Sequence, residues 1–236
     1  MSTQLFRTKR REDWSWGCGY RNAQILLSAM ASHPDIKDRL ALPEMTITHL
    51  QETLQGAWKQ GFDVAGAQQL GWKILGQKKW IGATEMYTIL CGLGIKSTVV
   101  DFHRPTSSLT RQHTLLLDWV FEYFTGDTGR EQPSQDDEFL PGVVKTEKLP
   151  LYFQHQGHSR TIIGVEVSKE KKRSLLLMDP SCPFPSANQE PSSFLSRVRC
   201  GIYHLARHRQ YQVVRVDPKG EVGKEHQIIR SIRIPS

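Results

Sequence analysis

The amino-acid sequence predicts an α+β fold in a single domain spanning residues 1–236. Apolar residues in the first half recur mainly with helical spacing, whereas the second half consists mostly of short apolar runs typical of strands. No internal repeat, linker or low-complexity tract divides the chain. With 38% hydrophobic and 23% charged residues, it can bury a core of ordinary size. We expect helices packed on a mainly antiparallel sheet, preceded by a flexible lead at 1–13.

The helices are expected mainly before residue 125. Ala23, Leu26, Leu27 and Met30 fall at i, i+3, i+4 and i+7, which predicts a core-facing helix over 20–30. A second apolar stripe predicts a helix from Thr48 to about Lys59, ended by Gly61. Similar reasoning predicts helices over 80–93 and 113–124.

The strands are expected mainly in the second half. The β-branched run at 96–102 predicts the first strand. Short apolar runs predict the others at 149–154, 161–168, 174–178, 210–217 and 228–234. The charged run from Lys169 to Arg173 is a solvated turn between two of them. The polar segment 126–142, with its prolines and acidic residues, is expected to be an exposed and mobile loop.

Composition excludes several classes of function. No run of about 18 apolar residues is present, so no membrane span is expected. The N-terminal residues lack the apolar core of a signal peptide, which favours a soluble intracellular protein. The net charge of +7 comes without a nucleic-acid-binding signature. We interpret it as solvated surface with weak, non-specific nucleic-acid contact.

The four cysteines, Cys18, Cys91, Cys182 and Cys200, form no CxxC pair. Neither a disulfide framework nor a metal site is predicted from them, and no cofactor is expected. Cys91 has the surroundings of a buried core residue. Cys18 differs from it because glycines flank it at the start of a predicted helix.

Cys18, His158 and Asp179 are the predicted catalytic residues. Unpaired N–H groups and the positive end of the helix dipole would lower the pKa of the Cys18 thiol. The two strands between His158 and Asp179 form a hairpin, which returns Asp179 toward His158. The carboxylate can then hold one ring nitrogen of His158 and leave the other for Cys18. This order of groups predicts a cysteine peptidase with its site in a cleft between helices and sheet.

Each of these residues also has a structural interpretation. Taken singly, a histidine such as His158 is more often a surface or loop residue, and an Asp-Pro pair such as Asp179-Pro180 is often a turn. Most cysteines at helix starts are not catalytic. Four other histidines compete for the role of base: His103, His113, His155 and His204.

The longer sequence strings favour the catalytic interpretation. The string Trp16-Gly-Cys-Gly-Tyr-Arg-Asn-Ala-Gln24 resembles the nucleophile segment of the UFSP-type cysteine peptidases, which cleave ubiquitin-fold modifiers. Further matching strings indicate the branch of zinc-finger-containing ubiquitin peptidases (ZUFSP). They are Ala57–Asp63, Ala67–Leu70, Trp80–Ala83 with Glu85, Val100–His103, Leu151–Thr161, Leu176–Pro180 with Cys182-Pro183, and Gln210–Gln212. The resemblance covers roughly Trp14 to Asp217.

The resemblance implies a papain-like fold and a deubiquitinase that cleaves isopeptide bonds in polyubiquitin, preferentially lysine-63-linked. It places the nucleophile on Cys18, the base on His158 and the third member on Asp179. It also implies action in the nucleus and cytoplasm, in the DNA damage response. The zinc fingers and ubiquitin-binding modules of that branch are not found before Cys18, so we expect weaker binding of long chains.

The same resemblance implies the substrate contacts. Asp63 and Glu85 match acidic positions that bind the basic C-terminal tail of ubiquitin, since carboxylates pair with guanidinium groups. Their structural interpretations are an N-cap or turn for Asp63 and a solvated helix face for Glu85. Trp80, with Trp14 and Trp16, is a candidate for lining the tunnel of the tail.

The sequence assigns no side-chain donor for stabilising the oxyanion. Modifier-specific relatives use a tyrosine upstream of the cysteine, and residues 1–17 contain none. Gln156 or Gln154 is a candidate instead, beside the backbone N–H of Cys18.

Two other functions stay open at this point. In the modifier-specific relatives a histidine directly follows Asp-Pro, whereas Ser181 follows Asp179-Pro180 here. This departure favours ubiquitin, but a protease for another ubiquitin-fold modifier is the alternative. An inactive binding module that attaches to nucleic acid through basic surface is the third hypothesis, and the intact set of catalytic residues argues against it.

Overall fold

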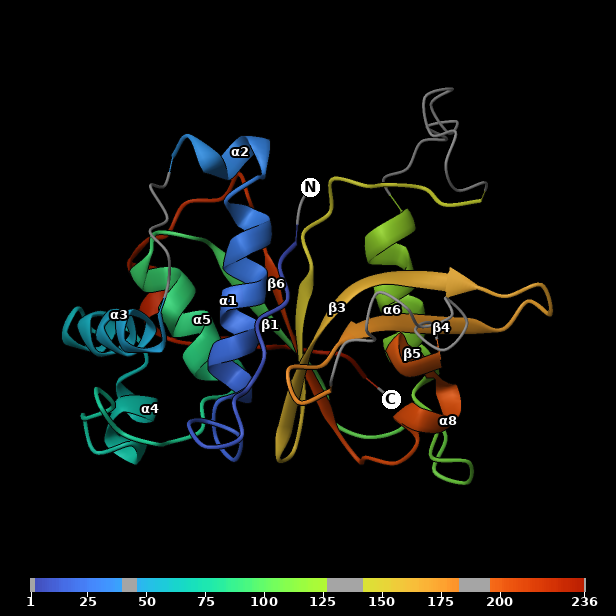
Figure 1. The fold of residues 1–236 in the computed structure, drawn as a ribbon, viewed down its shortest axis with the longest axis horizontal. Coiled ribbons are helices and arrows are strands. Elements are labelled where there is room, and N and C mark those ends of the chain that lie inside the picture. The colour runs from blue at the N-terminus through green and yellow to red at the C-terminus, as the bar shows by residue number, and fades with distance from the viewer. Residues whose placement is uncertain (1–2, 40–45, 127–141, 183–195, 236) are drawn as a thin grey trace.

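The computed structural model describes residues 3–39, 46–126, 142–182 and 196–235, and it confirms the predicted α+β class (Figure 1). The longer helices are α1 (Cys18–Met30), α3 (Ile47–Lys59), α5 (Ala83–Gly92) and α6 (Thr114–Thr125). Shorter helical segments are α2 (Pro34–Lys37), α4 (Val64–Gln69), α8 (Ile202–Leu205) and the 3₁₀ turn η1 (Lys224–Gln227).

Seven strands form one sheet in the order β5-β4-β3-β2-β6-β1-β7. Their bounds are β1 (Ser97–Phe102), β2 (Leu151–His155), β3 (His158–Val167), β4 (Arg173–Met178), β5 (Arg199–Gly201), β6 (Tyr211–Val216) and β7 (Ile232–Arg233). Every neighbouring pair is antiparallel except β1 with β7. The mainly antiparallel sheet expected from the sequence is thus present.

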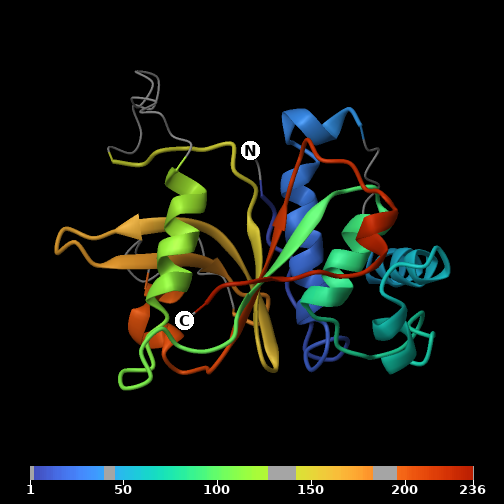
Figure 2. The same ribbon diagram turned by 180° about the vertical axis from the view of Figure 1, so that it is seen from behind.

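The sheet separates two hydrophobic cores. On one face, Tyr152 and Val214 pack with the buried sides of α1, α3 and α5. On the other face, the neighbouring residues Phe153 and Val213 pack with α6. Alternate residues of one strand point to opposite faces, so a single strand serves both cores. Accordingly, α1 lies in front of the sheet in the view of Figure 1, and α6 lies in front of it in the view of Figure 2.

The helices predicted over 20–30, 48–59 and 113–124 are confirmed as α1, α3 and α6. The helix predicted over 80–93 is wrong at its start, because α5 begins only at Ala83. The indole of Trp80 instead donates to the Ser15 carbonyl, and the Gly82 N–H donates to the Glu85 carboxylate. The sequence patterns missed α2 and α4, which are too short to show helical periodicity.

Two strand predictions also need correction. The strand expected from Thr161 begins at His158, because Gln156 and Gly157 alone form the turn from β2 and Gly157 takes a φ of +88°. The strand expected over 228–234 is reduced to Ile232–Arg233, and the apolar Ile228 is exposed. Most of the loop expected at 126–142 lies outside the described residues.

Within the described ranges, no helix is long and apolar enough to cross a membrane. Those same residues contain no group of three or more His, Cys, Asp or Glu side chains arranged to hold a metal ion.

Candidate active site

Cys18 is the first residue of α1, and backbone contacts fix it there. Gly17 is the N-cap, and a Cβ at Gly17 would come within 2.3 Å of the Asp13 carboxylate. A Cβ at Gly19 would come within 2.5 Å of the Ile81 carbonyl oxygen. Only glycine therefore permits these close approaches. The first N–H groups of α1 have no helical acceptor, and the thiol lies at the positive end of the helix dipole.

His158 and Asp179 meet across the β3–β4 hairpin. Thr161 pairs with Met178 in this hairpin, so Asp179 follows directly beside the start of β3. The Nε2 atom of His158 lies 2.9 and 3.0 Å from the two carboxylate oxygens of Asp179. This contact leaves Nδ1 as the ring nitrogen for Cys18. The arrangement is the one that a base and its orienting carboxylate require.

Two further groups hold the Asp179 carboxylate. Arg160 donates its Nε–H to Oδ2 at 2.9 Å, and the Ser181 backbone N–H donates to Oδ1 at 2.9 Å. Burial raises the pKa of Asp179, but the hydrogen bond and charge of His158, with these two donors, lower it overall to about 2. The carboxylate is therefore ionised and fixed in place at neutral pH.

Cys18 and His158 shift one another's pKa values in opposite directions. Burial raises the pKa of the Cys18 thiol, but hydrogen bonds from His158 and Ser159 outweigh it and the net shift is downward. Burial lowers the pKa of His158, whereas its hydrogen bonds with Asp179 and Cys18 raise it to about 9. Both shifts favour a thiolate beside an imidazolium, which is the reactive form of a nucleophilic cysteine.

A buried asparagine joins the helix of Cys18 to the strand of His158. The Asn22 amide donates to the Cys18 carbonyl at 2.9 Å and to Ser159 Oγ at 3.0 Å. Thr161 Oγ1 donates to Asn22 Oδ1 at 2.7 Å. Asn22 is fully buried, so these bonds form away from water and fix α1 against β3.

The segment ahead of Cys18 contacts both sides of this site. Thr8 donates its backbone N–H to the Pro180 carbonyl at 3.1 Å, next to Asp179. Asp13 is 2% exposed, and its Oδ2 accepts from Arg21 Nε at 2.8 Å. Part of the lead expected at 1–13 thus packs on the domain in the described structure.

A cleft of about 280 Å³ adjoins the three residues. Its walls are the start of α5 with the preceding segment, the β2–β3 turn, and Gln69 of α4. Cys18, His158, Trp80, Glu85 and Gln154 all line it. The Oε1 atom of Gln154 is buried without a hydrogen-bond partner among the described residues, so the wall of the cleft holds one unsatisfied polar atom. The cleft thus lies between the helices and the sheet, where the sequence placed it.

The predicted substrate-binding residues lie at different places. Glu85 lines the cleft and also accepts from the Gly82 N–H at 2.6 Å, near the start of α5. Asp63 is the N-cap of α4, accepting from the Gly66 N–H at 3.1 Å, and is 9% exposed. Trp80 is 55% exposed at the rim of the cleft. Gln156 lies in the β2–β3 turn and lines a neighbouring pocket.

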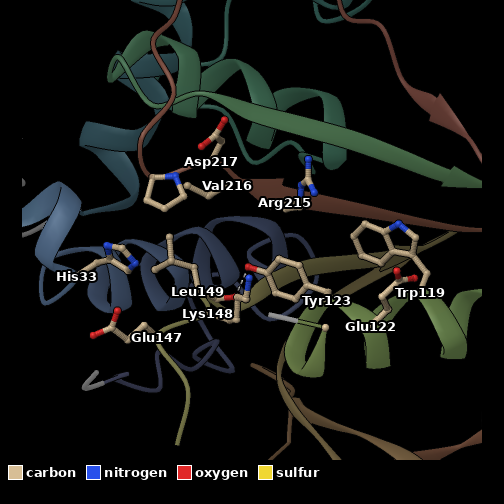
Figure 3. Close-up of a pocket in the computed structure, with 12 residues that line it drawn as sticks. His33, Trp119, Glu122, Tyr123, Glu147, Lys148, Leu149, Arg215, Val216 and Asp217 are labelled. Atoms are coloured by element: carbon tan, nitrogen blue, oxygen red, sulfur yellow. Dashed lines mark hydrogen bonds between the residues drawn. The ribbon is translucent and has the colours of Figure 1, made fainter. Parts of the chain in front are cut away.

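Another pocket, of about 600 Å³, lies at the opposite end of the same elements (Figure 3). Side chains from α6 and from the end of β6 face it, including Tyr123 and Arg215. His33 lines it just beyond the end of α1, whereas Cys18 begins that helix. A 13-residue helix is about 20 Å long, so this pocket is remote from the thiol.

Sequence reasoning gave no role to Arg160 or Asn22, although both lie within the strings that it singled out. Their spacing was the available signal. Arg160 is two residues from His158, on the same face of a strand, and Asn22 is four residues from Cys18, on the same face of a helix.

The model of peptidase family C78 matches residues 1–214 of this chain. The zinc finger-containing ubiquitin peptidase 1 of Bos taurus is 40% identical over 225 residues, which are 92% of this chain and 36% of that protein. The human protein of the same name is 39% identical with the same coverage. The chain thus spans about a third of the length of these relatives.

Two further proteins are similar. The ubiquitin carboxyl-terminal hydrolase mug105 of Schizosaccharomyces pombe is 35% identical over 170 residues, 71% of this chain and 61% of that protein. The crystal structure of UfSP from C. elegans matches with a TM-score of 0.52 and 14% identity, covering 93% of this chain and 33% of that one. At that identity the likeness concerns the fold alone, and it agrees with the expected papain-like arrangement.

Proposed function

We propose that this chain, which belongs to the cysteine peptidase family C78, is a deubiquitinating isopeptidase with Cys18 as nucleophile, His158 as base and Asp179 as orienting carboxylate. The observation that carries the proposal is the connected set of hydrogen bonds from Cys18 through His158 to Asp179, at the edge of a cleft. The names of the similar proteins support ubiquitin as the modifier.

The reaction is acyl transfer in two steps. The Cys18 thiolate attacks the carbonyl carbon of the C-terminal glycine of ubiquitin and forms a tetrahedral oxyanion. His158 gives its proton to the departing lysine amine, and a thioester remains on Cys18. Water then gives one proton to His158 as its oxygen attacks the thioester carbonyl. The second tetrahedral intermediate expels the Cys18 thiolate and frees the C-terminal carboxyl group of ubiquitin, which gives its remaining proton to solvent.

Two donors in the cleft suit the oxyanion. The backbone N–H of Cys18 lies at the first turn of α1, where N–H groups have no helical acceptor. The Gln154 side chain lines the same cleft, and its Nε2 carries the N–H groups from which an oxyanion could accept. Gln156 is less suited to this role, because it is exposed in the turn and lines the neighbouring pocket.

The acidic residues on the α4 and α5 side suit a basic substrate tail. Glu85 lines the cleft, and Asp63 lies close enough for the charge of Glu85 to contribute to its raised pKa, after the larger effect of burial. An arginine of the ubiquitin tail could pair with Glu85, while Trp80 packs against the tail at the rim. A protease for another ubiquitin-fold modifier is the alternative, since the fold is shared with UfSP.

A probe experiment tests this function. Ubiquitin carrying a C-terminal electrophile should form a covalent adduct with the wild type but not with Cys18→Ala, and much more slowly with His158→Ala. Cys182→Ala is the matched control, because Cys182 is the other cysteine with a partly exposed side chain in the described residues. Failure with ubiquitin but reaction with a different modifier's probe would establish the alternative.

The preferred linkage, the cellular process and the location rest on the resemblance of the sequence to the ZUFSP branch alone. We propose polyubiquitin, preferentially lysine-63-linked, as the substrate, and action in the nucleus and cytoplasm during the DNA damage response. Cleavage of a panel of linkage-defined diubiquitins tests the first part. Imaging of the tagged protein before and after DNA damage tests the second.

A further inference from the structure

The neighbouring pocket that Gln156 lines is distinct from the one in Figure 3 and has a volume of about 610 Å³. It lies on the other side of the β2–β3 turn from the catalytic cleft. Gln156 of the turn lines this pocket, while the next two residues, Gly157 and His158, line the cleft. The two cavities are therefore separated by a single turn of the chain, and that turn leads into the strand of the catalytic histidine.

The lining of this second pocket is basic. Among the described residues that line it are three arginines, two histidines and two glutamines, and none carries a carboxylate. The cations come from three distant segments: Arg104 follows β1, Arg209 precedes β6, and Arg233 belongs to β7. Arg209 and Arg233 are exposed and form no ion pair within the described part of the chain, so their guanidinium donors face solvent.

The surroundings of the pocket add to its positive potential and hold its shape. The pKa of His208 is lowered, first by burial and then by the charges of Arg160, Arg207 and Arg111. The ring of His208 stacks on that of His155, with centroids 3.5 Å apart. Burial, with the charge of His208, lowers the pKa of His155 to about 4, so this ring is neutral and can stack. The stack fixes the end of β2 against the loop before β6.

Charge is thus distributed asymmetrically about the catalytic pair. Glu85 and Asp63 lie toward α5 and α4, while the loop between α8 and β6, which carries Arg209, lies beyond the β2–β3 turn (Figures 1 and 2). If the basic tail of ubiquitin lies on the acidic side, the protein on the other side of the scissile bond faces the basic pocket. This fits the proton transfer, because the leaving amine must lie near His158.

We propose that the basic pocket binds acidic side chains that flank the ubiquitylated lysine of the acceptor protein, and so makes the enzyme selective for acidic modification sites. The inference rests on the proposed function. Guanidinium groups bind carboxylates bidentately, which suits a pocket rich in arginine. No phenylalanine, tyrosine or tryptophan among the described residues lines it, which makes a single-stranded nucleic acid a poorer fit, since such strands bind by stacking on aromatic rings.

Three substrates separate this inference from the proposed function. In two of them ubiquitin is joined by an isopeptide bond to a lysine in a synthetic peptide, flanked either by Glu and Asp or by Gln and Asn. In the third, a small fluorophore on the C-terminus of ubiquitin replaces the peptide, so this substrate has no acidic residues that the pocket could bind. The kcat/KM of each is measured at low and at high salt.

The wild type should cleave the acidic peptide about three to ten times faster than the neutral one, because each exposed ion pair contributes at most a few-fold. The double variant Arg209→Gln/Arg233→Gln should lose this preference and still cleave the fluorophore substrate normally. Lys37→Gln removes one positive charge on α2, at the far end of α1, and should keep the preference. High salt should reduce the preference in the wild type by screening.

The outcomes that contradict the inference are distinct. Equal cleavage of the two peptides by a wild type that cleaves the fluorophore substrate overturns the selectivity alone. A wild type that cleaves none of the three substrates overturns the proposed function and the selectivity with it. If the double variant instead loses affinity for a single-stranded oligonucleotide while the peptides are cleaved equally, the pocket binds a phosphate backbone and the inference is wrong.

Discussion

Replacing Asp179 by Asn tests the electrostatic role of the carboxylate while preserving its shape. Asp179 is the first of the groups that raise the pKa of His158, which moves from 6.5 to about 9 against the opposing effect of burial. At 1.36 kcal/mol per pH unit, this shift corresponds to about 3 kcal/mol in favour of the imidazolium. Asp179→Asn removes the first of the contributions that oppose burial, so it should cost on the order of 1–2 kcal/mol, a factor of roughly ten.

The consequence should appear at Cys18. Because the imidazolium of His158 becomes less favourable without the carboxylate, it stabilises the thiolate less and the pKa of the Cys18 thiol rises. The rate of alkylation by iodoacetamide, followed against pH, reports the thiolate without any substrate. We expect its inflection to move to higher pH in Asp179→Asn, and ubiquitin-fluorophore hydrolysis at pH 7 to fall at least tenfold.

A matched variant separates this effect from a general loss of charge. Asp118→Asn also removes a carboxylate from an arginine, since Asp118 of α6 pairs with Arg173 of β4, far from Cys18. It should leave the alkylation profile unchanged. If Asp179→Asn, shown to be folded by circular dichroism, gives the wild-type alkylation profile and hydrolysis rate, the role assigned to Asp179 is refuted.

Three further results are expected. The hydrolysis rate should increase as pH rises through the lowered pKa of Cys18. It should decrease above about pH 9, because His158 then loses the proton that it gives to the leaving amine. A rate that keeps increasing above pH 9 would contradict this assignment. Asn22→Leu should lower the free energy of unfolding in urea by about 2–3 kcal/mol, because it leaves the buried partners of Asn22 on α1 and β3 unsatisfied. An unchanged urea midpoint would show that the hydrogen bonds of Asn22 are dispensable. Gly157→Ala should lower the Tm and the hydrolysis rate, because alanine at a φ of +88° costs about 1–2 kcal/mol in the turn before His158. A variant that is fully active and as stable as the wild type would exclude that strain.

The residue types of the candidate site were predictable because the information is local. Glycines around Cys18 at the start of an apolar helical stripe, and a short hairpin between His158 and Asp179, are patterns of neighbouring residues. The hairpin prediction brought His158 and Asp179 together, and the structure shows them in contact. The antiparallel register makes this meeting necessary, since strands of matched length return the chain to its starting edge.

The short elements were less predictable. α2 and α4 are 4 and 6 residues long, so they contain too few turns for apolar periodicity to appear. The start of β3 at His158 depends on the positive φ of Gly157, which permits a turn of two residues. A glycine in a sequence indicates that such a conformation is permitted but not that it is adopted.

Local patterns along the chain were therefore enough to predict the fold class, the longer helices and strands, and the three residue types with the chemistry of a thiol hydrolase. The groups that share Asp179, the bonds by which Asn22 joins α1 to β3, and the positions of the charged residues relative to Cys18 depend instead on contacts between distant segments. The basic pocket shows the reason, since Arg104 lies more than 100 positions before Arg209 and Arg233 in the printed sequence. Local patterns record the period and the ends of an element, whereas contacts of this kind arise from the order and register of strands, which many residues decide together.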